Sequence, residues 1–372
     1  MNTNVLEVKI NAIQILKNLA RNLGKNFFGH VEDVAQVCIT KLLQDPYSYM
    51  IRKESAKCMR FCIAACEDYP DKQKALYIMT YMKLMEELDK RVQRKEFDMI
   101  NAILKELFKQ LKLFYSFKAK GLTVYTVEDA TTFVNRLKEV HNLIKADKEE
   151  RIKKIKIMTK SKQVDEEDIE FFEEDLEKVD KGIHHIMEIS GFLMQNMGQQ
   201  ISGAIGQSLL PAYAQVLLNT SDKKVYELVD SVCMICDCME HGTPALFQQI
   251  QGQAGSKFME LIHFGSSDKE DIKYDLLQSA VFGLGIIAQR QENGQFAQLG
   301  DFIKVLGHTI STDTEGMDDD EKDSKLMLAD NSVSALVKII MFQYDGGNLV
   351  KDELCSTILS QKLPLTHDFD EA

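Results

Sequence analysis

The chain has 372 residues, of which 45% are hydrophobic and 27% charged, and its formal net charge is −12 at pH 7. This composition supports a sizeable buried core and excludes a chain that is disordered throughout or that lies mainly within a membrane. Only 5 prolines and 20 glycines are present, which favours helices, because both residues interrupt regular structure. The negative charge favours basic protein ligands and disfavours nucleic acid or an anionic membrane as the main partner.

Targeting and redox signals point to a reducing compartment. The amino end carries neither the basic nor the apolar segment of a secretory signal peptide, and no run of about 18 apolar residues is present. The eight cysteines lack the regular spacing of a disulfide framework. We therefore expect free thiols and no membrane-spanning helix.

In the first part of the chain, apolar residues recur every three or four positions, which predicts amphipathic helices. These span Val5–Gly24, Val31–Leu43, Ile51–Ala65, Ala75–Leu88 and Phe97–Phe114. Two proline-containing turns, Asp45-Pro46 and Tyr69-Pro70-Asp71, separate some of them. In the first helix one stripe is expected to be packed, and it consists of Val5, Val8, Ala12, Ile15, Leu16, Leu19 and Leu23.

The middle of the chain carries two stretches of opposite charge. Lys145–Lys162 contains eight basic and three acidic residues, and Asp165–Asp180 contains ten acidic residues and one lysine. One interpretation is a hairpin of two long solvated helices whose charges face each other. The other is an exposed electrostatic arm that takes part in partner binding.

Helices resume in the last part of the chain, and they span Leu209–Leu218, Val225–Met239, Ile272–Ala288, Phe296–Ile310, Leu326–Phe342 and Leu349–Leu359. Gly242-Thr243-Pro244 reads as a helix end, an N-cap and a proline at the first helical position. The starts of comparable helices lie about 46 residues apart, which is within the period of HEAT-like helix pairs. The acidic stretch Asp313–Asp323 is expected to be a disordered loop.

These patterns predict an all-α fold, a right-handed α-solenoid of HEAT repeats in which each helix pair packs on its neighbours. Residues 1–120 would form helix pairs, and residues 121–205 would form long charged helices within the solenoid. Residues 206–372 would form the carboxyl-terminal repeats, with the acidic loop at 313–323.

The cysteine-rich helix has the composition of a zinc site, with Cys233, Cys236, Cys238 and His241 close in sequence. At 100° per residue Cys238 points about 140° away from Cys233 on a helix, so the three sulfurs cannot reach one ion. We expect these thiols to pack in the core, as do Cys58, Cys62 and Cys66, and we expect no structural metal.

Gly283-x-Gly285-x-x-Ala288 matches a dinucleotide fingerprint in letters only, because a helix rather than a strand leads into it. Small residues within a helix instead allow a neighbouring helix to approach closely. No catalytic constellation is present in the sequence. We predict a protein that is not an enzyme and that uses no cofactor.

The helix Lys273–Gln289, followed by Glu292-Asn293-Gly294, resembles a signature helix of importin-β-type transport receptors. Cys236–Pro244 resembles the end of the preceding repeat, Asp330–Ile340 resembles the following repeat, and Leu363-Pro364-Leu365 fits near the end. From Leu209 onward the chain is similar to the carboxyl-terminal HEAT repeats of the importin beta-3 type in the importin-β (karyopherin-β) superfamily. The first 120 residues fit as ordinary HEAT pairs.

The resemblance implies a nuclear import receptor, or its carboxyl-terminal cargo-binding part, that carries protein cargo between cytoplasm and nucleus through the nuclear pore. The implied partners are basic protein cargo and nuclear pore proteins. The GTPase Ran would bind only if the amino-terminal repeats of the family, which have no counterpart in this sequence, are present.

Acidic or polar residues on inner helices would then meet lysine- and arginine-rich segments of the cargo. The candidates are Asp230, Asp237, Glu240, Asp330 and Asn331. The alternative function is a HEAT scaffold that does not shuttle and that holds subunits of an assembly together. Both functions need the same solenoid, so the sequence leaves them open.

Overall fold

The computed structural model describes residues 3–118, 126–161, 166–219, 224–266, 272–292, 297–310, 314–344, 346–348, 350–363 and 365. Helices and turns, but no strands, make up these ranges. The chain forms two compact units, Met1–Ile189 and Ser190–Ala372, and the boundary lies within helix α7. The region 121–205, which the sequence sets apart by its charge, is therefore divided between the two units.

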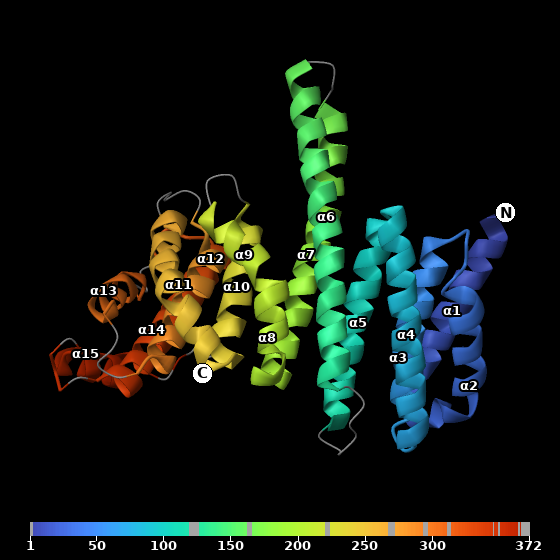
Figure 1. The fold of residues 1–372 in the computed structure, drawn as a ribbon, viewed down its shortest axis with the longest axis horizontal. Coiled ribbons are helices and arrows are strands. Elements are labelled where there is room, and N and C mark those ends of the chain that lie inside the picture. Colours follow the sequence, from blue (N-terminus) through green and yellow to red (C-terminus); the bar gives the residue numbers. More distant parts are fainter. Residues whose placement is uncertain are drawn as a thin grey trace. The chain divides into compact units, whose positions relative to one another are not determined.

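The described part of the first unit contains six α-helices and most of a seventh, α7, and successive long helices run in opposite directions (Figure 1). They are α1 (Thr3–Leu23), α2 (Phe28–Val37), α3 (Tyr49–Ala65), α4 (Pro70–Arg94), α5 (Phe97–Lys118), α6 (Val127–Ser161) and α7 (Glu166–Met197), with short turns η1 (Gly24–Phe27) and η2 (Cys38–Leu42) beside α2.

The second unit continues with helices of 6 to 25 residues. They are α8 (Gln199–Ser208), α9 (Leu210–Leu218), α10 (Val225–His241), α11 (Pro244–Gly265), α12 (Tyr274–Arg290), α13 (Leu299–Thr309), α14 (Asp319–Gln343) and α15 (Asp352–Thr357), followed by η4 (Ile358–Lys362). Helices two apart in the chain pack side by side, since α12 contacts both α10 and α14.

The predicted helices of both units are present, and local sequence signals set their ends. The Ser48 hydroxyl accepts a hydrogen bond from the Ile51 amide at 3.3 Å and caps α3. The Thr243 hydroxyl accepts one from the Leu246 amide at 3.2 Å, and Pro244 begins α11 as expected. Each capping oxygen satisfies an amide at a helix start that has no partner within the helix.

The apolar stripe predicted to be packed on α1 is instead largely exposed, and that prediction was wrong. Val8 is 67% and Ile15 is 59% exposed, and Val5, Leu19 and Leu23 are more than 40% exposed. The residues of α1 that are buried are Ile13 and Ala20. The helix has apolar residues on more than one face, and its contact with α3 decides which face is covered.

The core positions expected of α3 are confirmed. Ile51, Cys58 and Cys62 are fully buried, and Cys66 is 1% exposed. Cys236 and Cys238 of α10 are also buried, whereas Cys233 is only partly covered. These thiols pack as small apolar groups, as the sequence predicts. Within the described residues no group of three or more His, Cys, Asp or Glu side chains is arranged to hold a metal ion.

The glycines of α12 lie where neighbouring helices approach closely, as predicted. A Cβ atom on Gly283 would lie 2.3 Å from Cε2 of Phe258 on α11 and 2.9 Å from Sγ of Cys236 on α10. A Cβ atom on Gly285 would lie 3.2 Å from Ala335 on α14. Glycine at these positions therefore lets α12 pack tightly against three helices.

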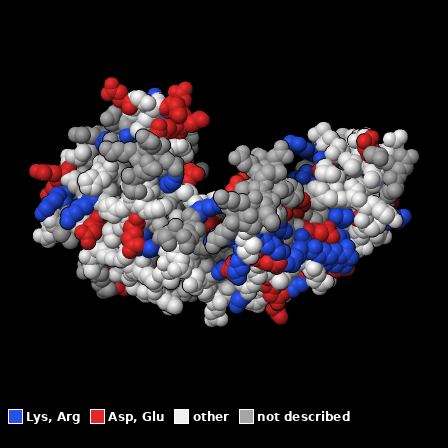
Figure 2. Space-filling model, turned by 90° about the horizontal axis from the view of Figure 1, so that it is seen from above, with Lys and Arg blue, Asp and Glu red and all other residues white. Residues whose placement is uncertain are grey.

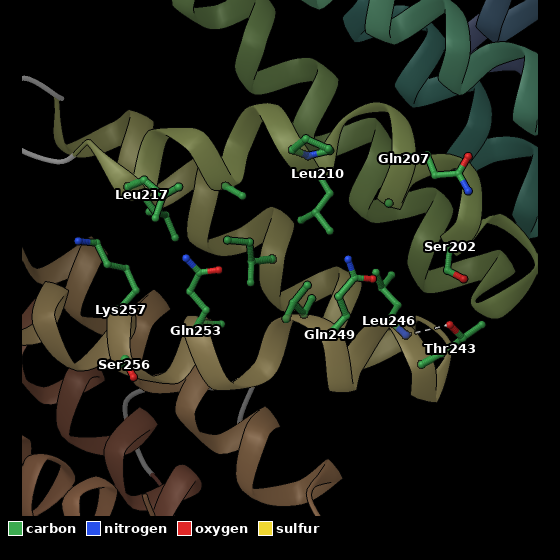
Figure 3. Close-up of a pocket in the computed structure, with 18 of the residues that line it drawn as sticks. Ser202, Gln207, Leu210, Leu217, Thr243, Leu246, Gln249, Gln253, Ser256 and Lys257 are labelled. Carbon is green, nitrogen blue, oxygen red and sulfur yellow. Dashed lines mark hydrogen bonds between the residues drawn. The ribbon is translucent and has the colours of Figure 1, made fainter.

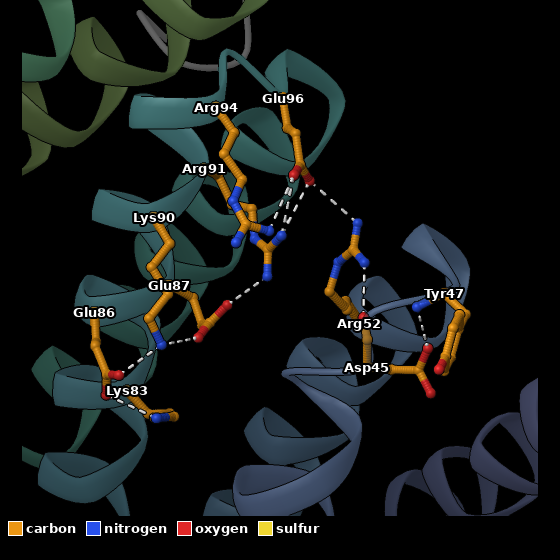
Figure 4. A network of polar contacts seen from close by, with 10 residues as sticks. All are labelled: Asp45, Tyr47, Arg52, Lys83, Glu86, Glu87, Lys90, Arg91, Arg94 and Glu96. Atoms are coloured by element: carbon orange, nitrogen blue, oxygen red, sulfur yellow. Dashed lines mark hydrogen bonds and ion pairs between the residues drawn. The ribbon is translucent and has the colours of Figure 1, made fainter.

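A buried polar network joins α3 to the end of α4 (Figure 4). Arg52 donates a hydrogen bond to the Asp45 carbonyl at 2.8 Å and another to the Glu96 carboxylate at 3.2 Å. Arg91 donates to the same carboxylate at 3.1 Å and to Glu87 at 2.8 Å. Glu96, in the turn between α4 and α5, thus binds arginines from two helices and fixes the turn.

The acidic stretch 313–323 is a loop only in part. Residues 314–318 form turns, and α14 begins at Asp319, seven residues before the predicted helix at Leu326. The Asp318 carboxylate accepts a hydrogen bond from the Glu321 amide at 2.9 Å, and the next three residues are acidic. Negative charge is favourable at a helix start, where backbone amides point outward, so the acids extend the helix.

Among the described helices, α14 is the one whose length and composition would allow it to cross a membrane. More than half of that stretch is buried, and α14 packs against α12 and α13. This is the pattern of a core helix of the unit.

Candidate protein-binding surfaces

Three of the sequence-predicted binding residues lie on α10, but their surroundings differ. Asp230 is 5% exposed, so its carboxylate is almost wholly inside the unit. Asp237 is partly buried, and Glu240 is exposed near the carboxyl end of the helix. Spacings of seven and three residues place them along one side of the helix.

Asp237 lies directly against the last part of α7. A Cβ atom on Gly191 would lie 2.2 Å from Oδ2 of Asp237, so only glycine leaves room for this carboxylate. Burial, and to a smaller extent the negative charge of Glu240, raises the pKa of Asp237 to about 7. The carboxyl of Asp237 therefore exchanges its proton near neutral pH, and a cation bound beside it would favour the charged form.

The other two predicted residues lie on α14. Asn331 is 7% exposed, and its side-chain amide donates a hydrogen bond to the Met327 carbonyl of the same helix at 3.1 Å. Asp330 is partly exposed. Because α10 and α14 both pack on α12, the five residues lie on two helices with a third as their common neighbour.

The face of α12 between them is partly apolar. The Cys233 thiol of α10 lies 4.0 Å from the Ser279 hydroxyl, and the Lys338 ammonium of α14 lies 4.8 Å from the ring centre of Phe282. Of the five predicted residues, Asp237, Glu240 and Asp330 are at least partly exposed, whereas Asp230 and Asn331 are buried.

The second unit also contains a groove of about 620 Å³ that the sequence did not reveal (Figure 3). Helices α8 and α9 form one wall and α11 forms the other, and Ile235 of α10 contributes to the lining. Leu210 and Leu217 face the groove from α9, and Gln249 and Gln253 face it from α11 (Figure 3). Such a groove suits an apolar side chain flanked by polar groups. It arises where helices distant in sequence leave a gap, so no local pattern signals it.

The charges of the α6–α7 hairpin face each other, as one of the two interpretations predicts. Lys148 of α6 forms an ion pair with Asp180 of α7, and both side chains are about 10% exposed or less. Arg151 binds Asp147 at 2.5 Å on its own helix and also pairs with Asp175 across the hairpin. The other interpretation, an exposed electrostatic arm that takes part in partner binding, stays a prediction, and the side chains of residues 159–172 lie outside the described residues.

No protein-family model and no curated protein matches the sequence. Solved structures do match over the whole chain. Kap121p bound to Pho4p matches 100% of this chain and 31% of its own length, with a TM-score of 0.66 and 17% identity. The karyopherin Kap121p bound to the SUMO protease Ulp1p matches with a TM-score of 0.65 and 18% identity. Kap121p bound to Nup53p matches with a TM-score of 0.65 and 17% identity.

The chain thus spans a little under a third of the Kap121p chains that it matches. Identity of 17–18% shows a shared fold and carries no residue-level correspondence. The all-helical composition of the described residues and the match over 100% of this chain agree. The chain therefore has the all-α HEAT-repeat solenoid fold of the karyopherin Kap121p, as the resemblance to importin-β receptors implies.

Proposed function

We propose that the chain is a nuclear transport receptor of the importin-β type, or the cargo-binding part of one, and not an enzyme. The observation that carries the proposal is the structural match of the whole chain to Kap121p. Kap121p has been solved bound to Pho4p, Ste12p, Ulp1p and Nup53p, which makes it a binder of several proteins. In the proposed function, this chain likewise binds proteins and carries them as cargo between cytoplasm and nucleus.

Basic cargo segments would bind the acidic groups of α10 and α14. The accessible candidates are Asp237, Glu240 and Asp330, because Asp230 and Asn331 are buried. Acidic side chains also gather at one edge of the part that contains the carboxyl-terminal helices (Figure 2). Attraction between such exposed charges is screened beyond about 8 Å at physiological ionic strength, so binding should weaken with salt.

We assign nuclear pore proteins to the groove between α9 and α11. Its lining combines leucine side chains with glutamines, and it includes none of Asp230, Asp237 and Glu240 of α10. An apolar residue in a polar segment would fill it, and cargo and pore protein would then occupy separate surfaces. Ran would join them only in a protein that also carries the amino-terminal repeats of the family.

The test is affinity purification of the chain from nuclear and cytoplasmic extracts, with and without GTP-loaded Ran. Proteins with lysine-rich segments and nuclear pore proteins should be recovered. Recovery of a fixed set of subunits in constant ratio, with no pore protein, would instead establish a scaffold that does not shuttle. That outcome would overturn the transport assignment.

Two pairs of substitutions, each replacing carboxylates by amides of the same shape, locate the cargo site. Measured at pH 8, above the pKa of Asp237, Asp237→Asn with Glu240→Gln should weaken binding of a lysine-rich peptide, because two negative charges are removed from one face of α10. The control, Asp301→Asn with Glu353→Gln, removes two exposed charges from α13 and α15 and should leave affinity unchanged. Equal effects of both pairs would show that net charge, rather than this face, governs binding.

A further inference from the structure

A cationic surface covers neighbouring faces of α3 and α5 in the first unit. Lys53, Lys57 and Arg60 lie on α3, and Lys105, Lys109 and Lys112 lie on α5. Both sets follow the spacing i, i+4, i+7, which places each set on one side of its helix. The two helices pack against each other. Six cations are thus brought together in a chain whose net charge is −12.

The acids within this surface lie beneath it. Glu54 is 3% and Glu106 is 2% exposed. Glu106 lies 3.8 Å from both the Arg60 guanidinium and the Lys109 ammonium, and burial raises its pKa. Burial lowers the pKa of Lys109, and the charges of Arg60, Lys105 and Lys57 lower it further despite Glu106. Lys57, Arg60 and Lys109 therefore share two buried acids, because Glu54 also pairs with Lys57 at 2.7 Å.

Part of the surface has no partner within the described residues. Lys105 and Lys112 are exposed, and neither they nor Lys53 form an ion pair there. Gln110, one turn beyond Glu106, is completely buried, yet neither polar atom of its side chain is hydrogen-bonded. Oε2 of Glu106 also lacks a hydrogen bond. These atoms are enclosed within the unit, so a segment bound at the surface would contact the exposed ammonium groups of Lys105 and Lys112 instead.

Aromatic rings lie between the cations. The Lys53 ammonium is 5.3 Å from the ring centre of Tyr49, the Arg60 guanidinium is 4.7 Å from that of Phe61, and the Lys112 ammonium is 4.3 Å from that of Phe108. These three rings are partly exposed. Contact with the rings limits the conformational freedom of these long side chains, which lowers the entropic cost of binding an anion.

We propose that the cationic surface binds an acidic segment of a partner protein. From i to i+7 each row of cations is about 10 Å long, the length of roughly three extended residues. A nucleic acid would extend beyond this length over a chain with net charge −12, which repels its phosphates. A short run of Asp or Glu fits within it. Glu188 of α7, which accepts a hydrogen bond from His185 at 2.8 Å, lies near Lys112 and limits the surface on that side.

This site is independent of the proposed cargo site, which lies in the second unit and attracts basic segments. The chain would hold two protein segments of opposite charge. An acidic partner segment on α3 and α5 would leave the acidic groups of α10 and α14 free for cargo.

The test uses fluorescence anisotropy of labelled hexaglutamate with the full chain. Lys105→Glu with Lys112→Glu reverses two exposed cations. It also removes the attraction between Lys112 and Glu188, so circular dichroism checks that the fold is retained. Affinity should fall about tenfold, equivalent to roughly 1.4 kcal/mol. The control, Lys41→Glu with Lys153→Glu, makes the same change in net charge on exposed residues elsewhere in the unit and should change affinity less than about twofold.

Three results would overturn the proposal. The first is no binding of hexaglutamate at low salt, and the second is an equal loss in the variant and the control. The third is tighter binding of a short oligothymidylate that is lost in the Lys105→Glu, Lys112→Glu variant, which would make the surface a nucleic-acid site. Loss of peptide binding in that variant alone, with unchanged binding of a lysine-rich peptide, establishes the acidic-segment site.

Discussion

Gly283→Ala should destabilise the second unit although alanine is the better helix former. The new methyl carbon would lie 2.3 Å from the Phe258 ring and 2.9 Å from the Cys236 sulfur, whereas carbon atoms in contact ordinarily lie about 3.5–4.0 Å apart. Phe258 is fully buried, so the ring or the whole of α12 must move by about 1 Å. Such overpacking typically costs about 1–3 kcal/mol, with more in tight places.

Replacing glycine by alanine within a helix stabilises the helix by about 1 kcal/mol, because alanine has the higher helix propensity. Because the new methyl carbon would lie only 2.3 Å from the Phe258 ring, we take the overpacking cost near the top of its range, about 3 kcal/mol. Subtracting the gain from alanine leaves a net loss of stability of about 2 kcal/mol. For a unit of this size that corresponds to a fall of about 4–8 °C in Tm. Gly252→Ala is the matched control, because a Cβ atom there meets no atom within 4 Å. It should raise Tm by about 2–4 °C.

The assay is differential scanning calorimetry of the full chain and of both variants. A Gly283→Ala protein that is as stable as the Gly252→Ala protein would refute the close approach of α11 and α12. Phe258→Leu provides a second check, because a smaller side chain makes room for the methyl group. In the Gly283→Ala background its cost should be smaller than in the wild type, with a coupling of about 1 kcal/mol or more.

Arg290→Ala should cost about 2 kcal/mol in urea unfolding, because this guanidinium donates hydrogen bonds to the carbonyls of Glu240 at 3.0 Å and Gly242 at 3.3 Å and thereby caps α10. Gln289→Ala, its exposed neighbour, should change stability by less than about 0.5 kcal/mol. Asp180→Ala removes the acid that pairs with the buried Lys148 and should cost about 3 kcal/mol, whereas Lys154→Ala breaks an exposed pair and should cost less than about 1 kcal/mol. Asp237→Asn should raise Tm at pH 8 and leave it nearly unchanged at pH 4. The pKa of Asp237 rises from 3.8 to about 7 on folding, so the folded state binds the extra proton between these values and the charged carboxylate lowers stability as pH rises through them. A Tm difference that does not change with pH would contradict this.

The helical class and most helix positions were predictable from the sequence because they depend on neighbours in the chain. Apolar residues at three- and four-residue steps give an amphipathic helix wherever it packs, and Ser48 and Thr243 cap their helices through bonds within three residues. The geometry of one helix also predicted core packing for Cys233, Cys236 and Cys238, of which Cys236 and Cys238 are buried and Cys233 is only partly covered. The glycines of α12 predicted close helix packing, because small residues within a helix allow a neighbouring helix to approach.

Which face of each helix is covered was decided only by the tertiary structure. The stripe on α1 that is most apolar is exposed, while Asp230 and Asn331, chosen as binding residues because they are polar, are buried. Asp313–Asp323 was expected to be a loop from its charge, yet the amide groups at the start of α14 stabilise part of it as helix.

The groove beside α11 and the cationic surface depend on residues far apart in sequence that meet only after the helices pack. In α3 and α5 each row of three cations resembles an ordinary solvated face. Only their packing places Arg60 beside Glu106 and Lys109. The sequence by itself determined the helices, because hydrogen bonds and caps act within one turn. The tertiary structure determined the binding surfaces, because charge and burial depend on which helices become neighbours.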